Sequence, residues 1–162
     1  MESATAAQAA SIDGTGSTTV ADLLPKAAEQ YGERPAVMFK DDSGKWVPLT
    51  FAEVGERVRA LSLGLMDLGV EKGDKVSILA NTRLEWTLFD FAALTAGATV
   101  VPIYQTNSSD ECHYVLENSD AKVVIVEDGE QLAKVQAVRD RLPLLEHVIM
   151  MDGEGAGATP MT

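Results

Sequence analysis

The sequence predicts an α/β fold in which a parallel sheet is covered by helices on both faces and a β-hairpin is attached. The main observation is that short, β-branched apolar runs alternate with helical runs between residues 75 and 151. These strands are apolar at consecutive positions, which is typical of parallel strands buried on both faces. The repeating unit is clearest in LTAGATVVPIYQT at residues 94–106. There a helix ends at Gly97, a strand follows, and Pro102 prevents that strand from continuing as a regular central one.

The first elements along the chain are a helix and a hairpin. Residues 19–31 form an apolar stripe at helical spacing, and Thr19 with Asp22 makes an N-terminal capping pair. Pro25 lies inside this run, so the regular helix is expected to begin only at Leu24. The segments AVMFK (36–40) and KWVPLT (45–50) flank the turn sequence DDSG, which predicts a β-hairpin.

The strongest predicted helix covers residues 51–68. Thr50 and Glu53 form a capping box at its start, and Gly69 closes its end. Six large apolar residues recur at steps of three and four: Phe51, Val54, Val58, Leu61, Leu65 and Leu68. Burial of each contributes roughly 1.5–3 kcal/mol, against about 1 kcal/mol for the cap, so packing is expected to hold this helix.

The remaining elements alternate regularly. Thr82 with Glu85 is expected to cap one of the helices, and Ser108 with Glu111 another. The predicted elements are strand 75–80, helix 83–96, strand 99–103, helix 109–118, strand 122–127, helix 129–141 and strand 147–151. The connections between the parallel strands are expected to be right-handed. Together these elements predict a flavodoxin-like layer.

The sequence divides into three parts. Residues 1–17 are small and polar and are expected to be a disordered leader. Residues 18–151 form the α/β part, and residues 152–162 are expected to be a Gly-rich loop interrupted by the chain's end. TGSTT (15–19) is similar to a flavin-phosphate loop but lacks a preceding strand, so it is interpreted as a helix N-cap. GEGAG (153–157) has no helix behind it to hold a dinucleotide phosphate.

Composition excludes several classes of function. The formal net charge of −12 disfavours nucleic acids and anionic membranes, because like charges repel. The single cysteine, Cys112, excludes an internal disulfide and suits a reducing compartment. No apolar run approaches the roughly 18 residues needed to span a bilayer, and no secretory signal begins the chain. We therefore expect a soluble, cytoplasmic protein that is at most peripheral to membranes.

Four motifs carry a resemblance to a known family. LTAGATVVPIYQT resembles the second core motif of the adenylate-forming (AMP-binding) synthetases, and PLTFAEV (48–54) resembles their first. GDKVSILANTRLEW (73–86) matches the spacer between these motifs, and ECHYVLENSDAKVVIVED (111–128) is similar to the long-chain fatty acyl-CoA synthetase branch. The resemblance extends over about residues 18–150. It implies a parent enzyme that uses ATP and Mg²⁺ to convert a fatty acid, through an acyl-adenylate, into acyl-CoA.

The chain carries only scaffold motifs of that family. Adenylate formation needs amide N–H groups, a Lys or Arg and Mg²⁺ around the phosphates. The family supplies them from a Ser/Thr/Gly-rich loop ending in Pro-Lys-Gly and from a C-terminal lysine, and this sequence has neither. We therefore assign no catalytic, cofactor-binding or metal-binding residue. The chain is expected to be an N-terminal fragment, inactive alone, that self-associates through apolar surfaces.

Isolated candidate residues give only weak signals. His113 is expected to face solvent, and Cys112 to pack in the core. The adjacent carboxylates Asp41–Asp42 and Glu127–Asp128 more often mark turns or helix caps than acid–base pairs. The apolar helix containing Trp86 is expected to belong to the core. The functional alternative is a minor role in lining an acyl chain.

Other classes of protein stay open at this point. A stand-alone flavodoxin-like module would carry a flavin, and a non-catalytic interaction domain would fold cooperatively without a ligand. A receiver-type signalling domain is disfavoured. Such a domain needs an acidic pair after its first strand and a phosphoacceptor aspartate at the end of its third, and neither is clear in this sequence.

Overall fold

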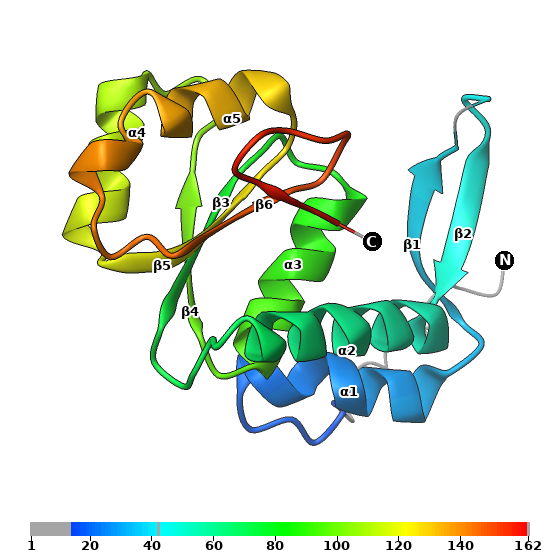
Figure 1. Cartoon of the computed structure of the whole chain (residues 1–162). Helices are drawn as coiled ribbons and strands as arrows, with labels where there is room; N and C mark the ends of the chain where they lie inside the picture. The colour runs from blue at the N-terminus through cyan, green and yellow to red at the C-terminus, as the bar shows by residue number, and fades with distance from the viewer. Residues whose placement is uncertain (1–13, 42, 162) are drawn as a thin grey trace, which may run out of the picture. The chain divides into compact units, whose positions relative to one another are not determined.

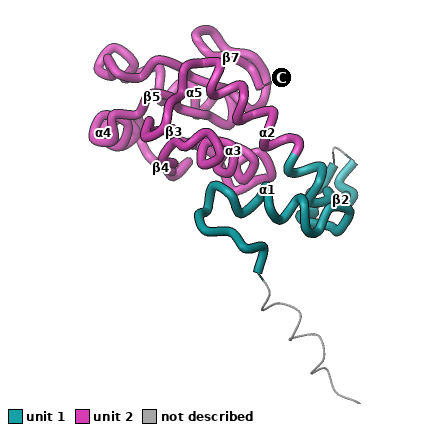
Figure 2. The backbone as a smooth tube through the Cα atoms, turned by 90° about the horizontal axis from the view of Figure 1, so that it is seen from below, with its two compact units in different colours: residues 1–55 teal, residues 56–162 magenta. Residues whose placement is uncertain are grey.

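The computed structural model describes residues 14–41 and 43–161, so residues 1–13 of the predicted leader (1–17) lie outside the described residues. The backbone divides into two compact units, residues 1–55 and 56–162, which are coloured separately in Figure 2. The boundary between the two units therefore falls inside the predicted α/β part, residues 18–151.

The first unit contains helix α1 (Val20–Tyr31), which begins earlier than predicted. The Thr19 hydroxyl accepts from the Asp22 N–H at 3.2 Å, and the Asp22 carboxylate accepts from the Thr19 N–H at 2.9 Å. This capping box satisfies the first amides, so the helix starts at Val20 and continues through Pro25. The expected start at Leu24 is wrong, because the proline costs one backbone bond without ending the helix. TGSTT thus supplies an N-cap, as interpreted.

A two-stranded antiparallel hairpin follows, formed by β1 (Pro35–Lys40) and β2 (Trp46–Thr50). At its turn the Asp41 carboxylate accepts from the N–H groups of Ser43 and Lys45, at 2.9 and 3.0 Å, and Gly44 adopts φ +79°. The predicted hairpin is confirmed. Asp41 is a turn residue, whereas Asp42 lies outside the described residues.

Helix α2 (Phe51–Asp67) confirms the strongest sequence prediction. Thr50 and Glu53 form the expected capping box, with Glu53 Oε2 accepting from the Thr50 N–H at 2.8 Å. Gly69 follows the helix with φ +85°, the left-handed conformation that glycine adopts without strain. Of the predicted stripe, Val54, Val58 and Leu65 are buried, and Phe51, Leu61 and Leu68 are half-buried.

The second unit contains a five-stranded, fully parallel sheet in the order β4-β3-β5-β6-β7. In chain order its strands are β3 (Lys75–Leu79), β4 (Thr99–Ile103), β5 (Ala121–Val126), β6 (His147–Met150) and β7 (Thr159–Pro160). Numbered from β3, this is the 2-1-3-4-5 order of flavodoxin-like sheets. Strand β4, which contains Pro102, lies at an edge, where a residue without an N–H is tolerated.

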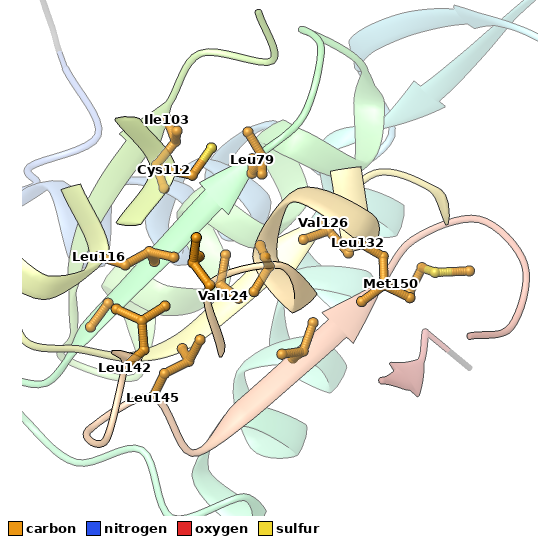
Figure 3. Close-up of a cluster of buried hydrophobic side chains, with 14 residues drawn as sticks. Leu79, Ile103, Cys112, Leu116, Val124, Val126, Leu132, Leu142, Leu145 and Met150 are labelled. Atoms are coloured by element: carbon orange, nitrogen blue, oxygen red, sulfur yellow. The ribbon is translucent and has the colours of Figure 1, made fainter. Parts of the chain in front are cut away.

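Helices cover both faces of this sheet, as predicted. In Figure 1, α4 (Ser109–Asn118) and α5 (Gly129–Gln136) lie on one face, and α3 (Leu84–Thr95) lies on the other. The core under α4 and α5 is drawn in Figure 3, where Leu116, Leu132, Val124 and Val126 are among the buried side chains. Alternate residues of β5 point into this cluster, because successive side chains of a strand face opposite sides of the sheet.

Three local predictions for this unit differ from the structure. The N-cap of α3 is Arg83 without a side-chain cap, because Glu85 bonds to the Arg83 side chain and not to Thr82. The predicted helix 129–141 ends at Gln136. Its next turn tightens, with the Val138 N–H bonding to Val135 O at 3.2 Å, before a 3₁₀ turn at Arg139–Arg141. The Gly-rich tail also contains the short strand β7, which adds to β6 in parallel.

Candidate functional site

The carboxyl edge of the parallel sheet gathers several polar side chains. β3, β5 and β6 are adjacent and parallel, so the residues after their last positions meet at one edge. Asn81 follows β3, Glu127 follows β5 and Asp152 follows β6. The backbone holds them in place, since the Glu127 N–H bonds to Leu79 O at 3.1 Å and the Asp152 N–H to Glu127 O at 2.9 Å. In this fold the gap between β3 and β5 is the topological switch point, where ligands commonly bind.

Arg83 ties these strand ends together. Its Nε donates to Glu85 Oε2 at 2.6 Å, and its Nη1 lies 3.5 Å from Glu127 Oε1. Its Nη2 donates to Asp152 Oδ1 at 3.1 Å, and Nη1 makes a second contact to Oδ2 of the same carboxylate. Asn81 completes the set, because its backbone N–H and side-chain amide donate to Glu127 Oε2 at 2.7 and 2.8 Å. We call these five residues the Arg83 network.

In the Arg83 network, the positive charge of Arg83 is already paired with carboxylates. The hydrogen bond that Arg83 donates to Asp152, together with its pairing to Glu85, raises the pKa of the Arg83 guanidinium above its ordinary value. One cation thus faces three carboxylates, and the edge has a net negative charge. The next residue, Asp128, caps α5 by accepting from the N–H groups of Glu130 and Gln131, each at 3.0 Å. The first amides of that helix are therefore occupied by a protein carboxylate.

This chemistry does not fit a nucleotide phosphate. A triphosphate needs free N–H donors and uncommitted cations, whereas carboxylates surround the switch point here. Among residues 14–41 and 43–161, no group of three or more His, Cys, Asp or Glu side chains is arranged to hold a metal ion. The same segments contain no helix that is both long and apolar enough to cross a bilayer. The arrangement is suited to fixing the strand ends.

Two histidine and cysteine predictions have different outcomes. Cys112 is fully buried in the core of α4, as expected, and burial raises the pKa of its thiol. The expectation that His113 faces solvent is wrong, because the residue is only 8% exposed. Its Nδ1 lies 3.2 Å from Arg141 Nη2, and Arg141 also donates to Asp110 at 2.9 Å. The α4 register turns His113 toward the segment after α5, where Arg141 covers it.

The second unit also carries an apolar groove of about 320 Å³. Its walls come from α2, from Phe89 of α3 and from the β6–β7 edge of the sheet. Its lining residues include Ala60, Leu61, Gly64, Ile149, Pro160 and Met161. The small side chains on α2 leave this space open. The same helix exposes Leu63 and Met66, each by more than half. We call this surface the α2–β7 groove.

The sequence analysis did not identify the Arg83 network. A usable signal was present, because Asn81 and Asp152 directly follow predicted parallel strands and Glu127 is the last residue of another. The carboxyl ends of parallel strands share one edge, so residues at that offset are expected to meet. Asp128 caps a helix, as expected. Trp86 was expected to lie in the core, but the structure leaves it only half-buried on α3.

Comparison with known proteins extends this picture. The family described as "AMP-binding enzyme" matches residues 24–161. The long-chain-fatty-acid–CoA ligase heimdall of Drosophila melanogaster is 38% identical over 138 residues, which is 83% of this chain and 20% of that protein. The long-chain-fatty-acid–CoA ligase FadD15 of Mycobacterium bovis is 40% identical over 115 residues, 71% of this chain and 19% of that protein.

A solved structure agrees with these relatives. A Rhodopseudomonas palustris protein assigned as a long-chain-fatty-acid CoA ligase superposes with a TM-score of 0.78 at 26% identity. The superposition covers 88% of this chain and 35% of the other. The chain thus spans about one fifth of the length of the curated relatives it matches. The family match over most of the sequence, together with the shared fold, shows that this chain belongs to the AMP-binding enzyme family.

Proposed function

We propose that this chain is the N-terminal scaffold portion of an ATP-dependent long-chain fatty acid–CoA ligase. The whole enzyme would join a fatty acid to coenzyme A through an acyl-adenylate, using ATP and Mg²⁺. The observation that carries the proposal is the family match over residues 24–161, with relatives named as long-chain-fatty-acid–CoA ligases. The chain alone is proposed to be inactive.

The Arg83 network supports the proposal that this chain is a scaffold and not the nucleotide site. Its carboxylates disfavour a triphosphate at the switch point, so the nucleotide site of the whole enzyme is proposed to be built by residues outside this chain. The role left to the sheet is to hold its strands in register. Arg83 contributes to that role by linking residues that follow β5 and β6.

The α2–β7 groove supports a scaffold that contacts further protein. Exposed apolar surface of this kind commonly marks an interaction site. In the isolated chain the groove has no partner from the described residues, so we propose that the chain self-associates through it. Size-exclusion chromatography over a concentration series, together with binding of a hydrophobic dye, tests this proposal. A chain that stays strictly monomeric and binds no dye would contradict it.

The strand order also suits a stand-alone flavodoxin-like module, the alternative from the sequence. Such a module would hold a flavin phosphate at the switch point. Glu127, Asp128 and Asp152 disfavour that anion there, so we favour the ligase scaffold. A preparation that takes up flavin mononucleotide with a yellow colour would reverse this preference.

Fatty-acid-dependent exchange between ATP and pyrophosphate tests the main proposal. The assay is run on the purified chain alongside a thermal melt that establishes folding. A cooperative melt without exchange is the expected result. Exchange that persists through repeated purification would mean that residues of this chain build the phosphate site, and would overturn the assignment.

A further inference from the structure

A second hollow lies at the carboxyl edge of the sheet, beside the ends of β3 and β4. Its volume is about 250 Å³. It is lined by Ala80, Thr82, Trp86, Pro102, Ile103, Tyr104 and Gln105. Leu79 pairs with Ile103 in the sheet, so residues 80 and 104 leave two neighbouring strands at the same level. α3 supplies Trp86 from its first turn.

Hydrogen bonds hold the backbone around this hollow in place. Lys134 of α5 donates to Gln105 O at 2.6 Å, and the Asn107 N–H bonds to Tyr104 O at 3.0 Å, which fixes the loop after β4. On the opposite side, the Arg83–Glu85 pair holds the start of α3. A site whose backbone is fixed before binding loses less conformational entropy when a ligand enters.

The lining chemistry selects a class of ligand. Trp86 and Tyr104 offer two aromatic rings, and Tyr104, 78% exposed, is the most exposed large hydrophobic residue in the described part of the chain. Thr82, Trp86 and Tyr104 have no side-chain hydrogen-bond partner among the described residues. A planar ring bearing an amide or hydroxyl can stack on the aromatic rings and also bond to these polar groups, whereas an alkyl chain can do neither.

The charge and the size of the hollow narrow the class of ligand further. No lining residue is ionisable near neutral pH, and the chain's net charge of −12 repels anions. The volume lies below the roughly 300–1,000 Å³ typical of pockets for drug-sized ligands, so it suits one ring with a small substituent. We propose that this hollow binds a neutral planar aromatic molecule in contact with Trp86 and Tyr104. This inference goes beyond the proposed scaffold role, because it gives the chain a ligand of its own.

Benzamide is a suitable probe, titrated into the ¹⁵N-labelled full chain and followed by NMR. The two tryptophans give two indole N–H signals. We expect the Trp86 signal and the backbone amides of residues 80–82 and 105 to shift saturably, with a dissociation constant on the order of 1 mM. The signal of Trp46, on the β1–β2 hairpin, is expected to stay in place.

Matched variants identify the site. Tyr104→Ala, at a position 78% exposed, is expected to weaken benzamide binding about 3- to 10-fold. Tyr114→Ala removes another exposed tyrosine, from α4, and should leave the affinity unchanged. Trp86→Leu should abolish the saturable shifts, with a thermal melt as its folding control. Equal affinity for Tyr104→Ala and wild type would overturn the assignment.

Two further ligands test the chemical class. Cyclohexanecarboxamide has a similar size and the same amide without a planar ring, so it is expected to bind at least 3-fold more weakly than benzamide. Octanoate represents an acyl chain and should not shift the Trp86 indole signal. Binding of octanoate at or above the affinity of benzamide would assign the hollow to an acyl group. The absence of saturable benzamide shifts would overturn the proposal.

Discussion

Replacing Arg83 with methionine tests whether the Arg83 network stabilises the sheet. Methionine retains most of the aliphatic length but removes the guanidinium that contacts Glu85, Glu127 and Asp152. Three carboxylates would then face one another without a cation. Glu127 keeps its bonds from Asn81, so the variant is expected to loosen the strand ends locally without unfolding the sheet.

The magnitude follows from exposure. The side chains of Arg83, Glu85 and Glu127 are 27%, 23% and 14% exposed, whereas that of Asp152 is 53% exposed. Fully exposed pairs contribute about 0–1 kcal/mol, and breaking a buried pair costs about 3–5 kcal/mol. We therefore expect Arg83→Met to lower the free energy of unfolding by about 2 kcal/mol. For a chain of this length, that corresponds to a fall in Tm of about 4–8 °C.

Urea unfolding followed by circular dichroism measures this change. Arg59→Met, at an exposed arginine of α2 that forms no ion pair with any described residue, is the matched control and should change the stability by less than about 0.5 kcal/mol. A double-mutant cycle with Asp152→Asn should give a coupling free energy above about 0.5 kcal/mol. If Arg83→Met is no more destabilising than Arg59→Met, the network does not stabilise the sheet.

Two further predictions concern the core and acid stability. Leu116→Ala, at a position 1% exposed in α4, should cost about 2–5 kcal/mol of unfolding free energy, whereas Leu144→Ala, at a position 56% exposed, should be nearly neutral; equal losses would refute the assigned core. The Glu71 N–H and Lys122 hold the pKa of Asp74 below its ordinary value of 3.8. Asp74 therefore stabilises the fold above that value and loses this contribution as pH falls through its lower folded-state pKa. Asp74→Asn should thus be less stable than wild type at neutral pH, and the difference should shrink toward pH 2 in denaturant titrations. A difference that does not change with pH would contradict this assignment.

Local sequence signals predicted most elements correctly. The capping pairs Thr19–Asp22, Thr50–Glu53 and Ser108–Glu111 all form, because each depends only on residues three positions apart. Pro102 also marked its strand as unsuited to a central position, and β4 lies at the sheet edge. These features can be predicted without knowledge of contacts between residues that are distant in sequence.

Several errors in prediction arose where a tertiary contact outweighed a local signal. Glu85 was expected to support a cap at Thr82, but it bonds to an arginine that distant carboxylates also hold. His113 was expected at the surface, but Arg141, 28 positions away in sequence, covers it. Strand β7 was missed because its two residues carry no periodic signal of their own. It forms because β6 offers an open edge.

The sequence by itself determined the fold class, the order of elements and the resemblance to adenylate-forming enzymes, since these depend on local periodicity, capping residues and motif spacing. Tertiary structure decided which strands are neighbours, and therefore which side chains meet at the carboxyl edge. Arg83 and Asp152 are 69 positions apart, and no local pattern links them. The same holds for the hollow between Trp86 and Tyr104, whose walls come from separate elements. Sites of this kind exist only once the parallel sheet has brought its strand ends to one edge.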